Sequence, residues 1–403
     1  MNLVTEYLKL GLRFDRVVEG YVDAYFGDPA LKAQVAGEEQ PDPAELGRQA
    51  AQLSAEVANT DLTPDRAAFI TSHLDALAVG GAVLAGENLS FISEVHSYFQ
   101  VEIAEIPTQD YEQAHQDVSD LIGGVGDLGD RLSALRAQEA CPPELVEKAV
   151  ATLAAALRER VVEPTGLTGL DEHIGFEIER DVAWSGFNYY LGNFTSRVAV
   201  NADIGHRMSQ LPVLVAHECY PGHHTEHCRK ESLLVQQADQ QEQTIFLVNT
   251  PQCLMAEGLG DLALTAAVGP GWARWAQGVL AGIGPTYDPD LAEALEIALR
   301  PLNTVRQNAA IMLHDKGTDP DVVIAYMKRW LMVDEARARQ MLRFMSDPLW
   351  RAYTSTYVEG ERLLRPWLEA RPVGQSALTR FQRLLDEPLT PSVVQAEMRA
   401  LAH

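Results

Sequence analysis

The sequence predicts a mainly α-helical protein that contains one small β-sheet. Apolar residues recur three and four positions apart through most of the 403 residues, which is the period of an amphipathic helix. The segment 174–201 departs from this period because it is rich in Phe, Tyr, Thr and Val and alternates in places. We therefore expect a large helical fold with a short sheet near the middle of the chain.

The helical period can be followed from the N-terminus onward. The clearest segments are 6–26, 144–162 and 320–345. Two further signals mark where helices begin, since Thr63-Pro64 and Asp319-Pro320 each place a capping residue before a proline at the first helical position. These patterns predict helices spread over the whole chain.

The predicted sheet at 174–201 lies directly before another helix. Within it, Gly192-Asn193 is a candidate hairpin turn. The helix that follows begins near Ser209 or Pro212 and carries a run of histidines. We expect the sheet and this helix to be neighbours, because elements adjacent in sequence are usually adjacent in space.

The predicted loops bear on how many domains the chain forms. Gly, Asp and Pro cluster at 123–130, 140–144 and 163–169, which favours turns and loops. None of these segments is long enough for a flexible linker between domains. We expect residues 1–403 to form a single helical domain of one or two lobes.

Composition and charge exclude several classes of function. Lys and Arg total 32 against 57 Asp and Glu, which gives a formal net charge of -25. Such a charge repels phosphate backbones and anionic membrane surfaces, so we expect no nucleic-acid partner. The most apolar stretch, 74–86, is short and interrupted by glycine, and a membrane span needs about 18 apolar residues. We therefore expect no membrane anchor.

The cysteines and the N-terminus indicate a reducing compartment. Four cysteines in a long chain show no paired spacing, which argues against a disulfide framework. The first residues carry charges where an export signal needs an unbroken apolar segment. A cytoplasmic location is the expectation; the oligomeric state has no signal in the sequence.

The run VAHECYPGHHTEH at 215–227 is the strongest chemical signal. His217 and Glu218 stand together with more histidines a few residues on, so imidazole nitrogens that bind zinc lie beside a carboxylate that can accept a proton from water. The familiar helical motif is H-E-x-x-H, but here the fourth residue after His217 is Pro221. Because positions six apart point about 240° away around a helix, a straight helix cannot bring His217 and His223 to one ion.

Pro221-Gly222 offers a way around this geometry. Proline interrupts a helix and glycine tolerates unusual backbone angles, so a kink at 220–222 would swing His223 toward His217. Two other pairings need no distortion: His223 with His227, and His224 with His227. The residues alone leave all three pairings open.

A catalytic zinc usually takes three protein ligands, so one more must come from elsewhere in the chain. Glu257 lies on a helical apolar pattern about one helix hairpin downstream, and Asp261 on the same pattern is its rival. A carboxylate would complete a site for one zinc ion.

The string HECYPGHH resembles the H-E-x-x-P-G-H-H signature of a bacterial family of unknown function. That family is zinc-peptidase-like and distantly similar to the thimet oligopeptidase and carboxypeptidase Taq group. Further segments occur in family-like order and cover most of the chain. They are VEGYVDAYFGDP, FNYYLGNFTSRVAVNAD, Glu257-Gly258, RQNAAIMLHDKG and TYVEGE.

The resemblance implies a fold and roles for single residues. It implies a helical zincin-like metallopeptidase architecture in which His217, His223 and Glu257 bind the metal and Glu218 is the general base. His224 would then orient a neighbouring ligand. The small sheet would precede the metal-binding helix.

Hydrolysis of a carbonyl compound also needs donors for the oxyanion that forms. The candidates are Tyr357, His314 and Arg306, with Tyr353 as a rival to Tyr357. An exposed edge of the sheet at 174–201 would let an extended peptide pair with it, which makes short peptides the expected substrates.

Three classes of function follow from these observations. The first is a zinc-dependent peptidase that cleaves short peptides. The second is a zinc hydrolase or lyase of another small carbonyl compound, since metal and base define a reaction better than a substrate. The third is a metal-binding or scaffold protein without activity.

Overall fold

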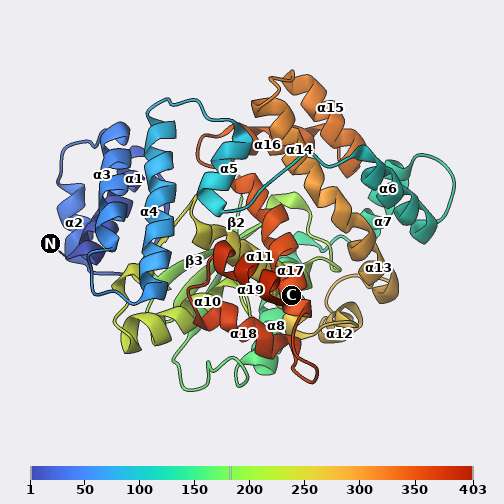
Figure 1. The fold of residues 1–403 in the computed structure, drawn as a ribbon. Helices are drawn as coiled ribbons and strands as arrows, with labels where there is room; N and C mark the ends of the chain where they lie inside the picture. The colour runs from blue at the N-terminus through green and yellow to red at the C-terminus, as the bar shows by residue number, and fades with distance from the viewer. Residues whose placement is uncertain (1, 181, 183, 402–403) are drawn as a thin grey trace.

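The computed structural model describes residues 2–180, 182 and 184–401. The fold is mainly α-helical with small sheets, which confirms the predicted class (Figure 1). The helices are α1 (Leu3–Val17), α2 (Pro29–Ala36), α3 (Pro43–Val57), α4 (Pro64–Leu84), α5 (Phe91–Phe99), α6 (Thr108–Ile122), α7 (Leu128–Gln138), α8 (Pro143–Val161), α9 (Leu211–Glu218), α10 (His223–Lys230), α11 (Pro251–Ala267), α12 (Trp272–Val279), α13 (Pro289–Leu299), α14 (Thr304–His314), α15 (Pro320–Leu331), α16 (Glu335–Ser346), α17 (Thr356–Glu369), α18 (Ala377–Asp386) and α19 (Pro391–Leu401). The strands are β1 (Val22–Tyr25), β2 (His173–Glu179), β3 (Gly186–Gly192), β4 (Thr195–Asn201) and β5 (Ile245–Leu247).

The predicted helix starts are confirmed, although only one of them has a side-chain cap. Pro64 and Pro320 open α4 and α15. Asp319 accepts a hydrogen bond from a backbone N–H of the first turn, whereas the side chain of Thr63 makes no such bond. A proline at the first helical position is therefore the stronger of the two signals here.

Two of the three periodic segments are divided by the fold. The helix predicted over 6–26 ends at Val17, and its last part is strand β1, which pairs with β5 after Gly20 at a positive φ of 87°. The segment 320–345 forms two helices because Met332 takes a left-handed conformation. The segment 144–162 matches α8.

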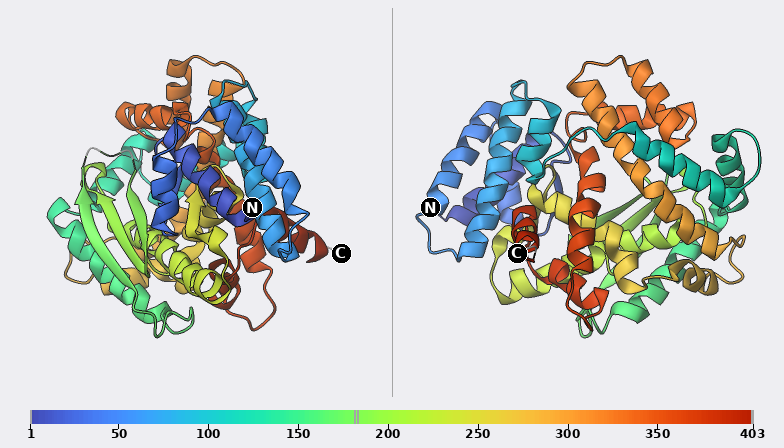
Figure 2. Two further views of the ribbon diagram at one scale, coloured as in Figure 1. Left: turned by 90° about the vertical axis from the view of Figure 1, so that its left-hand side faces the viewer. Right: turned by 45° about the vertical axis from the view of Figure 1, so that its right-hand side comes forward.

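The sheet predicted at 174–201 is present and has the strand order β2-β4-β3. Strands β2 and β4 are parallel, and β3 and β4 form an antiparallel hairpin. The turn lies one residue later than predicted, at Asn193 and Phe194, which both have positive φ, while Gly192 ends β3. The sheet occupies one face of the molecule, with α8 beside it (Figure 2).

Helix α11 runs through the main hydrophobic cluster and nearly all of its side chains are buried. It packs against α9 on one side and α17 on another. Gly258 and Gly360 allow the close approach of α11 and α17, because a Cβ on either glycine would lie within 3 Å of the other backbone. This packing fixes α11 as the support for side chains that face α9.

The N-terminal helices α1, α3 and α4 surround a second hydrophobic cluster at one side of the molecule (Figure 1). Of the described helices, the 21-residue α4 is long and apolar enough to cross a membrane, since an 18-residue stretch of it has a mean hydropathy of 1.5. The prediction that no segment is long enough to span a membrane considered only the stretch 74–86, which is shorter than α4. Its buried Phe69, Ile70, Leu74 and Leu77 pack in this second cluster, as in the core helix of a globular protein.

Candidate metal centre

The backbone between His217 and His223 is irregular, as predicted. Helix α9 ends at Glu218 and α10 begins at His223, with a cis peptide bond between Tyr220 and Pro221. The N–H of Gly222 donates to the carbonyl of Ala216, at 3.0 Å, and a Cβ on Gly222 would lie 1.9 Å from the carbonyl oxygen of His217. Only glycine fits there, and the break turns His223 back toward α9.

The break brings the two imidazole rings together. The ring centroids of His217 and His223 lie 4.6 Å apart and the rings are nearly perpendicular. Nε2 of His217 lies 3.5 Å from Oε2 of Glu257, and Nε2 of His223 lies 3.8 Å from Oε1 of the same carboxylate. One ligand atom from each of the three residues lies within 4.8 Å of the others, so this group could hold a metal ion.

The other nitrogen of each ring faces a second carboxylate. Nδ1 of His217 lies 3.2 Å from Asp261, and Nδ1 of His223 lies 3.8 Å from Glu226. A carboxylate on Nδ1 favours the tautomer that carries its proton there and leaves Nε2 free as a ligand. Asp261, the rival of Glu257 in the sequence, therefore lies behind His217 instead of among the three converging ligand atoms.

Glu257 is oriented by a tyrosine from another helix. The O–H of Tyr353 donates to Oε1 of Glu257 at 2.6 Å, while Oε2 is buried and has no hydrogen-bond partner among the described residues. Burial alone would raise the pKa of Glu257, but His217 and His223 together with Tyr353 lower it below its usual value. The carboxylate is thus ionised at neutral pH, with one oxygen available to a cation.

The two histidines and Glu257 have the chemistry of a metal-binding group. Two imidazole nitrogens and one carboxylate oxygen are a donor set that zinc takes at catalytic sites. The side chains of His217 and His223 are 12% and 14% exposed, so solvent reaches the group. Oε2 of Glu257 makes no hydrogen bond among the described residues, which leaves it able to bind a cation.

Glu218 lies on the last turn of α9 and is buried. Its backbone carbonyl accepts a hydrogen bond from Nδ2 of Asn188 in β3, at 2.7 Å, which joins the end of α9 to the sheet. Burial raises the pKa of Glu218, His217 and His223 lower it, and Glu257 raises it further. A carboxylate with a raised pKa beside two imidazoles is suited to accept a proton.

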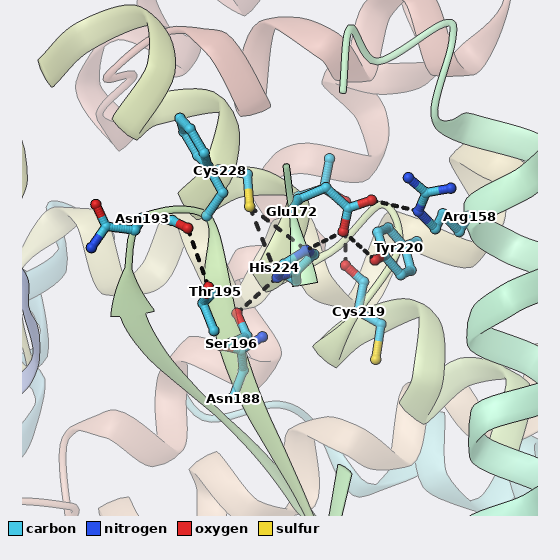
Figure 3. A network of polar contacts seen from close by, with 12 residues as sticks. Arg158, Glu172, Asn188, Asn193, Thr195, Ser196, Cys219, Tyr220, His224 and Cys228 are labelled. Carbon is cyan, nitrogen blue, oxygen red and sulfur yellow. Dashed lines mark hydrogen bonds and ion pairs between the residues drawn. The ribbon is translucent and has the colours of Figure 1, made fainter. Parts of the chain in front are cut away.

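His224 belongs to a separate buried network (Figure 3). Its Nδ1 lies 2.8 Å from Oγ of Ser196 and its Nε2 lies 3.0 Å from Oε2 of Glu172. Tyr220 donates to the same oxygen of Glu172, and Arg158 pairs with the other oxygen. Among the described residues no hydrogen bond links His224 to a ligand, so it does not orient one directly; it anchors the start of α10.

His227 is also kept away from the group. It is buried, its ring stacks on that of Tyr190 at 4.6 Å, and Phe246 lies against it edge-on. Burial lowers its pKa to about 3. The structure therefore brings neither of the undistorted pairings, His223 with His227 or His224 with His227, into a three-ligand group among the described residues.

The predicted oxyanion donors are only partly gathered at the site. Tyr357 interacts electrostatically with Glu257 and Glu218, and its ring lies 5.5 Å from that of Tyr353. Arg306 interacts with Tyr357, and its Nε is buried without a described acceptor. His314 lies elsewhere: its Nε2 contacts the carbonyl of Met345, and its ring stacks on Phe91.

Sequence reasoning missed three carboxylates: Glu172, Asp23, and Glu226, which lies 3.8 Å from Nδ1 of His223. No local sequence motif marks Glu172, because its partners Tyr220 and His224 lie about 50 residues further along the chain. Asp23 stands in the segment VEGYVDAYFGDP but received no role, although it interacts electrostatically with His223 and Glu257. The register shift between β1 and β5, at which Asp23 lies, could not be predicted from the sequence.

The fold and the site thus define a mainly helical protein with a His-His-Glu group able to hold a metal ion. No family model and no curated protein matches the chain. Its fold is similar to the crystal structure of the "putative lipoprotein from Colwellia psychrerythraea", with a TM-score of 0.53 and 16% identity over 93% of this chain and 70% of that one. At this identity the likeness shows a shared fold alone.

Proposed function

We propose that this protein is a zinc-dependent hydrolase that cleaves short peptides. The observation that carries the proposal is the convergence of His217, His223 and Glu257, with Glu218 next in the chain to the first of them. The resemblance to the zinc-peptidase-like family and a zincin-like architecture are parts of the same proposal. Both rest on the string HECYPGHH and on the further family-like segments of the sequence.

The metal would polarise the substrate carbonyl and acidify a water molecule. Glu218 would accept the proton of the attacking water and pass it to the leaving amine. Its burial suits this step, because a carboxylate with a raised pKa holds the proton long enough to donate it. Asn188 keeps this carboxylate in place through the backbone of Glu218.

Tyr357 and Arg306 are the proposed donors to the oxyanion. Both carry protons at neutral pH, since burial and nearby carboxylates raise the pKa of Tyr357 and an arginine stays charged. The buried Nε of Arg306 lacks a described acceptor, which leaves a donor for a developing negative charge. His314 is a poorer candidate because a backbone carbonyl occupies its Nε2.

Peptides are the proposed substrates because an edge strand lies next to the site. β3 is at the edge of the sheet, and Asn188 of this strand contacts Glu218. An extended peptide could add to this edge by backbone hydrogen bonds, which recognise a chain of any sequence. The scissile carbonyl would then lie beside Glu218.

Metal analysis of the purified protein and a peptide-library assay test this function. We expect about one zinc per chain, and Glu218→Gln is expected to keep the metal while lowering kcat by about 10³-fold or more. Glu19→Gln removes the same charge from an exposed position and serves as the control.

The ligands are tested in the same way. His223→Ala is expected to lose the metal, whereas His96→Ala, at a half-exposed histidine of α5, is expected to keep it. Metal retained by His223→Ala and lost by His224→Ala would contradict the ligand assignment. Bound metal without peptide turnover would favour a non-peptide carbonyl substrate or an inactive scaffold.

A further inference from the structure

Asp23 lies at an irregularity of strand β1. In the pairing of β1 with β5, Val22 faces Leu247 and Ala24 faces Phe246, so Asp23 has no partner residue of its own. Such a β-bulge re-aims a side chain away from the regular alternation of the strand. Here the bulged residue carries a carboxylate.

Strand β1, which carries Asp23, packs against edge strand β3, and Asn188 of β3 contacts Glu218 at the metal centre. The carboxylate of Asp23 interacts electrostatically with His223, Glu257 and Glu218, and also with Tyr189 of β3. It is half-buried, and no hydrogen bond or ion pair to it is found among the described residues. Burial raises its pKa to about 7, His223 lowers it, and Glu257 and Glu218 raise it further.

A cation would stabilise the ionised form of a half-buried carboxylate that lies near two other carboxylates. No lysine or arginine pairs with Asp23 among the described residues, and His223, whose imidazole favours the ionised form of Asp23, is itself a proposed metal ligand. Asp23 is also outside the group of three residues whose ligand atoms converge. A ligand that brings a positive charge would satisfy it.

We propose that Asp23 binds a cationic nitrogen of the peptide substrate, either the N-terminal ammonium or a lysine or arginine side chain, close to the bond that is cut. The inference rests on the proposed function, since it names the substrates of the same site. Tyr189 supports it, because an extended peptide along β3 would bring its end or its side chains past Asp23. An ammonium held there is bound by a charge-assisted hydrogen bond.

Binding is measured by calorimetry in the full chain carrying Glu218→Gln, so that no turnover intervenes. Three peptides serve as probes: trialanine with a free N-terminus, its N-acetyl form, and N-acetyl-Lys-Ala-Ala. We expect the free peptide or the lysine peptide to bind about 10- to 100-fold more tightly than N-acetyl-trialanine. Tight binding of free trialanine would identify the N-terminal ammonium as the group that Asp23 recognises. Tight binding of N-acetyl-Lys-Ala-Ala would identify a cationic side chain.

Adding Asp23→Asn is expected to abolish this preference while leaving the metal content and the affinity for N-acetyl-trialanine within about twofold. Glu19→Gln, which removes an exposed charge, should change none of these values. Equal affinity for all three peptides, or loss of metal in Asp23→Asn, would overturn the inference. If the wild-type protein cleaves peptides with no preference for a cationic nitrogen, the proposed function stands and the inference fails. If it binds cationic peptides preferentially but cleaves none, the inference stands and the proposed function fails.

Discussion

Nε2 of His224 lies 3.0 Å from Oε2 of Glu172, and this contact joins the start of α10 to the segment before β2 (Figure 3). The same oxygen accepts the hydroxyl hydrogen of Tyr220 at 2.5 Å. One carboxylate therefore holds Tyr220, inside the break at 219–222, and His224, just after it. Because His223 follows directly on this anchored segment, its position depends on Glu172 without any contact between the two.

Replacing Glu172 by glutamine is expected to destabilise the protein by about 1–3 kcal/mol. The amide cannot accept hydrogen bonds from Tyr220, His224 and Arg158 as a carboxylate does. Urea unfolding measures the change. Glu177→Gln, at a half-exposed residue of β2 that pairs with Arg197 at the surface, is the matched control and should cost less than about 1 kcal/mol. Equal costs would contradict the anchoring role.

The same carboxylate predicts a pH dependence of stability. Burial alone would raise the pKa of Glu172, but hydrogen bonds from His224, Tyr220 and Arg158 lower it from 4.5 to about 2. A depressed pKa in the folded state contributes stability that is complete above about pH 4.5 and is lost as the pH falls toward 2.

Wild type should therefore lose stability between about pH 5 and about pH 3 by more than Glu172→Gln does, by on the order of 1–2 kcal/mol. Urea midpoints of both proteins at the two pH values give the comparison. Parallel losses in the two proteins would show that Glu172 is not the titrating group.

Gly260→Ala is expected to weaken metal binding by about 10- to 100-fold, because a Cβ there would lie 2.6 Å from Cε1 of His217 and displace the ring. Competition with a chelator measures the affinity. Gly278→Ala in α12 is the control, since a Cβ at that position meets no atom within 4 Å. This control should keep its metal affinity and gain up to about 1 kcal/mol of stability.

The two tyrosines near Glu257 should separate metal binding from catalysis. Tyr353→Phe removes the hydrogen bond to Oε1 of Glu257 and is expected to reduce metal affinity about tenfold or more. Tyr357→Phe should leave metal affinity unchanged and lower kcat by about 10²- to 10³-fold. Calorimetric titration with zinc and steady-state kinetics on one peptide distinguish these outcomes. A reversed pattern would exchange the two roles.

Local sequence patterns predicted those parts of the fold that depend on interactions between residues close together in the chain. Helical period indicated α8, and the composition of 174–201 indicated the sheet, because propensity and alternation act over a few residues. The same reasoning failed at β1, because the helical period of apolar residues continues through 6–26 and predicted a helix where the backbone forms a strand paired with β5. That pairing depends on residues more than two hundred positions away.

The candidate site shows the same division. Pro221-Gly222 indicated a break, and the break allows His223 to face His217. The sequence could not rank His224 and His227 against His223, since all three are imidazoles on one short helix. Ser196 and Glu172 decide the place of His224, and the ring of Tyr190 that of His227.

The sequence by itself determined the helical class, the small sheet, the irregular backbone and the kinds of side chain that could bind a metal. Each of these follows from interactions within one turn or one hairpin. Only the tertiary structure decided that His217, His223 and Glu257 converge and that Asp23 of β1 interacts electrostatically with two of them. Convergence requires α9, α10 and α11 to pack at fixed distances, and packing is set by contacts between residues far apart in the chain.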